Sequence, residues 1–121
     1  MTYLELTLTL WKWEGVILKG GTFQQLVDYH RIFCGISTDL RNYTIGHTAV
    51  EYGKPWCLWI ADGTDMATLA HEALHVVSGV LEGRGLKHTA ESEEAYCYTL
   101  ESIVGAATDP KNKFRRVKWP V

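Results

Sequence analysis

The first clear pattern along the chain is a strict alternation of apolar and polar positions over residues 3–10. Leucines occupy every second position and polar residues stand between them: Leu4, Leu6, Leu8 and Leu10 against Glu5, Thr7 and Thr9. A period of two predicts a β-strand with one face buried. The apolar run VILK further on either continues this strand or pairs with it, and Gly20-Gly21 ends the run.

A helical pattern follows the first strand. Thr22, with Gln25 three residues later, forms a capping box that predicts a helix over about residues 23–34, and Gly35 ends it. One side of this helix carries four apolar residues and a histidine: Phe23, Leu26, Val27, Phe33 and His30. The next stretch predicts two strands, YTIGHTAVEY and WCLWI, within residues 43–60.

Two further helices complete the pattern. Asp65 is placed to cap a helix over about residues 66–82, and two glycines stop it. Thr89 is expected to cap a last helix that runs to about Ala107, where an Asp-Pro step terminates it. The predicted order β, α, β, β, α, α indicates the α+β class. We expect one domain over residues 1–110 and a basic C-terminal tail over residues 111–121.

Composition changes this picture little. Hydrophobic residues make up 46% of the 121 positions and charged residues 21%, as in a soluble globular domain with a core of its own. The net charge of −2 gives no general attraction to nucleic acid or membrane. Three widely spaced cysteines, Cys34, Cys57 and Cys97, predict buried reduced thiols in a cytoplasmic protein. No apolar run approaches the roughly 20 residues of a membrane helix.

The most specific functional motif in the sequence is His71-Glu72-Ala73-Leu74-His75. It is an H-E-x-x-H motif within the helix predicted over about residues 66–82. Residues four apart share a helix face, so His71 and His75 can bind one metal ion. Glu72 would stand beside that ion as the general base for a zinc-activated water. The surrounding helix is apolar almost all round, which predicts that all three polar groups are buried and need a partner such as Zn²⁺.

A third ligand is needed to close the site. The position of a third histidine in one zinc-protease pattern is Leu81, so a glutamate must be sought downstream. Candidates stand at the start of the last helix: His88, Glu91, Glu93 and Glu94. Glu94 follows His75 by 19 residues, close to the spacing of the glutamate-completed class. On a helical wheel Glu93 lies nearer the centre of the apolar side, so it is the alternative ligand.

The segments LAHEALHVVSGVL and ESEEAYCYTLESIV resemble the small H-E-x-x-H proteins of bacteriophage genomes, over roughly residues 43–105. The resemblance implies a minimal zincin-like fold: a small antiparallel or mixed sheet packed on the motif helix and a following helix that supplies the third ligand. It also implies that Glu94 is that ligand, in a gluzincin-type site. A phage or prophage origin and work in the bacterial cytoplasm follow from the same resemblance.

Zincin-type peptidases hold an extended substrate on an edge strand beside the motif helix, and WCLWI is the strand expected there. Its Trp56 and Trp59 either wall a cleft or pack in the core. The donor that polarises the substrate carbonyl is sought among Tyr98, His47 and His88, with Tyr98 as the preferred stabiliser of the transition state.

Two functions are therefore predicted. The first is a zinc metallopeptidase that acts on a protein or peptide substrate. The alternative is a phage accessory protein with a structural or vestigial zinc site that binds a host protein. The tail KNKFRRVKWPV provides basic and aromatic residues for such a partner, and neither nucleic acid nor membrane is expected.

Overall fold

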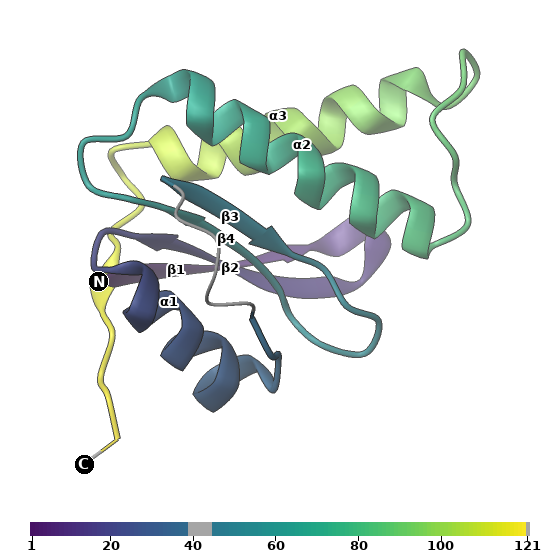
Figure 1. Cartoon of the computed structure of the whole chain (residues 1–121). Helices are drawn as coiled ribbons and strands as arrows, with labels where there is room; N and C mark the ends of the chain where they lie inside the picture. Colours follow the sequence, from purple (N-terminus) through teal and green to yellow (C-terminus); the bar gives the residue numbers. More distant parts are fainter. Residues whose placement is uncertain (39–44, 121) are drawn as a thin grey trace.

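The computed structural model describes residues 1–38 and 45–120, and a five-stranded mixed sheet lies at its centre (Figure 1). The strands are β1 (Thr2–Leu8), β2 (Trp13–Lys19), β3 (Gly46–Ala49), β4 (Trp56–Ile60) and β5 (Arg115–Arg116). They lie in the order β3-β4-β2-β1-β5. The β2–β4 pair is parallel and the other neighbours are antiparallel. The predicted α+β class with a mixed sheet is confirmed.

Helices cover both faces of this sheet. The helix α1 (Phe23–Tyr29) continues into a π-helical turn, η2 (His30–Cys34), and lies on one face. The helices α2 (Met66–Gly83) and α3 (Glu93–Thr108) lie side by side on the other face (Figure 1). A short 3₁₀ turn, η1 (Thr9–Trp11), joins β1 to β2. None of the described helices combines the length and apolarity that crossing a membrane requires.

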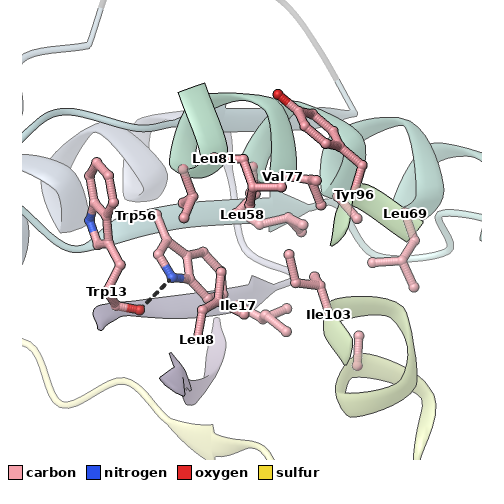
Figure 2. Close-up of a cluster of buried hydrophobic side chains, with 14 of the residues drawn as sticks. Leu8, Trp13, Ile17, Trp56, Leu58, Leu69, Val77, Leu81, Tyr96 and Ile103 are labelled. Atoms are coloured by element: carbon pink, nitrogen blue, oxygen red, sulfur yellow. Dashed lines mark hydrogen bonds between the residues drawn. The ribbon is translucent and has the colours of Figure 1, made fainter. Parts of the chain in front are cut away.

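Each face of the sheet has its own hydrophobic core, because successive side chains of a strand point to opposite faces. Trp56, Leu58 and Ile60 of β4 pack under α2 and α3. The alternate residues of the same strand, Cys57 and Trp59, pack against α1. Figure 2 shows the first core, in which side chains of the sheet, α2 and α3 meet. The apolar run WCLWI is thus buried on both faces.

The predicted helix ends are mostly confirmed. Thr22 and Gln25 form the capping box, and Gly35 ends η2 in the left-handed region with φ 66°. The Asp65 side chain accepts a hydrogen bond from the Thr68 N–H at the start of α2. Thr89, however, does not cap the last helix.

The α3 helix begins at Glu93 because the preceding loop satisfies its own polar groups. The Thr89 N–H donates to Ser92 Oγ at 2.8 Å, and Ser92 Oγ donates to the Lys87 carbonyl. This loop structure delays the helix by about one turn. The prediction that all three cysteines are buried is also wrong, since Cys34 and Cys57 are buried but Cys97 is exposed.

The strand expected at the sheet edge is not there. β4 lies between β3 and β2, and β3 is the outermost strand on that side of the described sheet. Trp56 and Trp59 are 0% and 2% exposed, so both are core residues and wall no cleft. Residues 43 and 44 of the predicted strand lie outside the described residues, and the described strand runs only from Gly46 to Ala49.

The described part of the basic C-terminal segment joins the domain. β5 pairs with β1, with Thr2 opposite Arg116, and the Val117 N–H donates to the Met1 carbonyl. Trp119 packs edge-on against Tyr29 at 6.4 Å between ring centroids. The segment therefore adds a strand to the sheet and an aromatic side chain to the core on the α1 face.

Candidate metal centre

The two histidines of the motif meet on the surface of α2. The His71 and His75 Nε2 atoms lie 3.1 Å apart, and the ring centroids are separated by 4.8 Å. At this distance the two nitrogens can share a hydrogen bond, in which the tautomers decide which Nε2 donates and which accepts. Nε2 is also an atom through which neutral imidazole binds Zn²⁺. The helix spacing thus aims two metal-ligand atoms at one point.

Both histidines are exposed, contrary to the expectation that the whole motif is buried. The buried side of α2 runs through Leu69, Ala73, Val76 and Val80. At 100° per residue, His71 falls almost opposite that stripe. The apolar residues around the histidines do not indicate burial here, because Leu74 is itself 47% exposed. Solvent can hydrate the two imidazoles, so they need no metal to offset burial.

Glu72 is the buried member of the motif, with 7% of its surface exposed. Its side chain lies in the seam between α2 and β3. The Thr48 hydroxyl lies 3.1 Å from Glu72 Oε1 and 3.0 Å from the Glu72 carbonyl oxygen, as a donor to both. Gly46 makes room for it, since a Cβ at that position would lie 2.8 Å from Glu72 Cγ.

Thr48 and Gly46 are site residues that sequence reasoning missed. Both stand in the segment GHT of the other predicted strand, whereas the edge beside the motif helix was assigned to WCLWI. Their alternation with His47 was the available signal, because it places Thr48 and Gly46 on one face of the strand and His47 on the other.

The candidate carboxylates do not lie beside the two histidines along the α2–α3 pair. Glu91, Glu93 and Glu94 are exposed at or before the start of α3. Leu69 and Ala107 line the same hollow, so the start of α2 lies beside the end of α3 and the helices are antiparallel. Glu94 accordingly lies towards the far end of α2, which extends eight residues, or about 12 Å, beyond His75.

The structure thus brings His71 and His75 together but does not bring Glu94 or Glu93 to them. Over residues 1–38 and 45–120, no three or more His, Cys, Asp or Glu side chains form a group that could hold a metal ion. Two imidazole ligands are in place, and none of the described residues joins them as a third protein ligand.

The candidate carbonyl-polarising donors have other surroundings. Tyr98 is 65% exposed and lines a hollow formed with β1 and η1. His88 stacks on Tyr96, with ring centroids 4.4 Å apart. His47 points to the α1 face, where its ring contacts those of Phe23 and His30. The His88 and His47 rings thus have aromatic contacts of their own, and Tyr98 lines a hollow that does not include His71 or His75.

No family model, curated protein or solved structure matches this chain. The resemblance to small phage H-E-x-x-H proteins therefore stays a hypothesis. The motif has to be judged on the geometry of its own residues.

A second pair of histidines lies on the opposite face of the sheet. The ring centroids of His30 and His47 are 5.8 Å apart. His30 is 0% exposed; its Nδ1 contacts the Thr38 hydroxyl, and its Nε2 has no hydrogen-bond partner among the described residues. Burial, and after it the charge of His47, lowers the pKa of His30 to about 4, although Glu51 opposes the shift. The position of His30 on the apolar side of its predicted helix was the signal for this burial.

The folded protein should become less stable as the pH is lowered, because His30 stays neutral in the folded state. The unfolded chain gains a proton on this residue below about pH 6.5, whereas folded His30 gains one only near pH 4. The free energy of unfolding should therefore decrease as the pH falls through this window, by roughly 2 kcal/mol from this group between pH 7 and pH 4.5. Urea unfolding at pH 7 and pH 4.5 measures the change.

His30→Asn keeps a polar partner for Thr38 and should reduce this pH dependence. His88→Asn changes an exposed histidine and is the matched control. Equal pH dependence in His30→Asn and the unaltered protein would show that His30 is not the titrating group.

Proposed function

We propose that the protein is a zinc-dependent peptidase built on a minimal zincin-like fold. The observation that supports this most is the 3.1 Å approach of His71 Nε2 to His75 Nε2, with Glu72 between them in sequence and next to the outermost strand β3. The phage origin and the bacterial cytoplasm as the place of action belong to the same proposal.

The chemistry of the donor set fits zinc in part. His71 and His75 would hold the ion through neutral imidazole nitrogens, which Zn²⁺ binds readily. Glu94 remains the proposed third ligand and Glu93 its alternative, and either requires α3 to approach the histidines more closely. A bound Zn²⁺ supplies Lewis acidity, which lowers the pKa of a water ligand and polarises a carbonyl.

Glu72 would serve as the general base. Its carboxylate accepts a hydrogen bond from the Thr48 hydroxyl, which fixes its position beside β3. It would take a proton from the attacking water and then give that proton to the leaving amine. β3 would bind an extended peptide substrate by backbone pairing, the part that the sequence assigned to WCLWI. Tyr98 keeps the proposed role of transition-state stabiliser only if a substrate brings it to the site.

A second candidate has an observation in its favour. Glu72 already has a structural role, because its bond to Thr48 ties α2 to β3. The presence of a glutamate at position 72 is therefore not by itself a sign of catalysis. On this alternative the protein is a phage accessory protein whose zinc site is structural or vestigial, and which binds a host protein.

The zinc content of the purified protein tests what the two candidates share. We expect equimolar zinc by mass spectrometry of the unaltered protein and a loss of zinc in His71→Ala and His75→Ala. Glu94→Ala should also lose zinc, whereas Glu93→Ala should keep it; the reverse result would assign Glu93. Glu101→Ala, which removes an exposed carboxylate further along α3, is the control. An unaltered protein without zinc would contradict both candidates.

A further inference from the structure

A hollow of about 380 Å³ lies between the β1–β2 connection and the loop that joins β3 to β4. We call it the Arg84 hollow. The residues that line it include three basic ones, two aromatic ones and one acidic one: Lys12, Lys54 and Arg84, Trp13 and Tyr52, and Glu14. Excess positive charge beside aromatic surface is a combination that suits an anionic ligand with an apolar body.

The guanidinium of Arg84 is fixed in place by neutral groups. Its Nε donates to the Trp11 carbonyl at 2.9 Å, and its Nη2 donates to the Lys12 carbonyl at 3.1 Å. The group also lies over the Trp13 ring, 4.6 Å from the ring centroid. A guanidinium has five N–H donors, so three of them have no partner in the described part of the chain. Arg84 is thus held by two backbone carbonyls, and neither of the described ion pairs includes it.

Lys12 adds a second cation at a strained position. Its φ of 52° is the one positive φ of a non-glycine residue in residues 1–38 and 45–120. A side chain in this left-handed region costs energy that glycine would avoid. The described ion pairs join Arg31 to Asp28 and Lys54 to Glu51, and Lys12 takes part in neither. The fold therefore keeps an unpaired lysine where glycine would be more stable.

Tyr52 provides the apolar part of the hollow. It is 80% exposed, and its ring meets Trp13 edge-on with centroids 6.4 Å apart. From these contacts we infer that the Arg84 hollow binds an oxyanion, a carboxylate or a phosphate, attached to a planar apolar group. The oxyanion would bind Arg84 and Lys12, and the planar group would pack on Tyr52.

This site is distinct from the histidine pair. Arg84 follows His75 by nine residues, about 13 Å along the helix axis. The negative end of the α2 dipole can account for a cation at Arg84, but it does not account for the strained Lys12. The inference stands whether or not the protein binds zinc.

Titration of the full chain with inorganic phosphate, phenyl phosphate and benzoate, followed by NMR at constant ionic strength, tests the inference. We expect saturable shifts at Arg84 and Tyr52, and phenyl phosphate should bind about tenfold more tightly than inorganic phosphate because its ring packs on Tyr52. The tighter of phenyl phosphate and benzoate assigns the oxyanion as phosphate or carboxylate. Absence of saturable binding for all three probes would overturn the inference.

Lys12→Gly separates a ligand-binding lysine from a structural one. It should raise the melting temperature, because the strain is relieved, and weaken phenyl phosphate binding several-fold. Tyr52→Ala should remove the advantage of phenyl phosphate over inorganic phosphate. Lys87→Gln, which removes another exposed lysine, should bind like the unaltered protein. Unchanged phenyl phosphate affinity in Lys12→Gly would contradict the assigned role.

Discussion

Glu72→Gln is expected to abolish peptide hydrolysis while zinc remains bound to His71 and His75. A glutamine cannot take a proton from water, so the rate should fall roughly 10²- to 10⁴-fold, the usual contribution of a general base. The amide oxygen can still accept the Thr48 hydrogen bond, which keeps α2 fixed to β3. Peptide products are measured by mass spectrometry on a mixed peptide pool, with zinc content and melting temperature recorded on the same samples.

The matched control is Glu82→Gln, which changes an exposed glutamate on the same helix and should leave hydrolysis unchanged. If Glu72→Gln hydrolyses peptides as fast as the unaltered protein, Glu72 is not the base and the proposed mechanism is wrong. If neither the unaltered protein nor Glu72→Gln hydrolyses peptides and both hold zinc, the accessory-protein candidate is favoured.

Trp56→Ala is expected to lower the free energy of unfolding by about 3–5 kcal/mol. The Trp56 side chain is 0% exposed, and its Nε1 donates to the Trp13 carbonyl at 3.2 Å (Figure 2). The neighbouring strand is shaped around this ring, because a Cβ on Gly15 would lie 1.9 Å from Trp56 atoms. The pocket therefore cannot collapse easily when the ring is removed. Urea denaturation followed by far-ultraviolet circular dichroism measures the loss.

Leu10→Ala removes an apolar side chain that is 80% exposed, and it should change the free energy of unfolding by less than about 0.5 kcal/mol. A loss below about 1 kcal/mol in Trp56→Ala would mean that the core on the α2 face repacks around the vacancy. The close fit between Gly15 and Trp56 would then not contribute as proposed.

Local chemistry explains which parts of the fold were predictable. The strand predicted from the alternation over residues 3–10, the Thr22 capping box and the Asp65 cap each depend on residues a few positions apart. The two caps are present, and the strand forms over Thr2–Leu8, whereas Leu10 lies in η1 and is exposed. The sheet order depends on the parallel pairing of β2 with β4 instead. Nothing in WCLWI itself distinguishes an edge strand from an inner one, except that an apolar residue at every position suits burial on both faces.

In the candidate site, too, the features set by local helix geometry were predictable and those set by tertiary packing were not. The spacing of four residues was enough to predict that the His71 and His75 rings meet, because helix geometry is local. The place of Glu94 depends on how far α2 continues past His75 and on how the loop before α3 folds. The number of residues between His75 and Glu94 does not determine the length of α2 or the conformation of the loop. The exposure of the two histidines likewise depends on which side of α2 meets the sheet.

The pairing of β5 with β1 has a consequence for synthesis on the ribosome. Thr2 lies opposite Arg116, so this contact joins segments from opposite ends of the described chain. The β1–β2 hairpin can form as soon as residues 2–19 emerge, but the other side of β1 stays unpaired until residue 116 leaves the exit tunnel. During that interval the nascent chain exposes a strand edge with unpaired backbone groups, the kind of surface that chaperones shield from neighbouring chains.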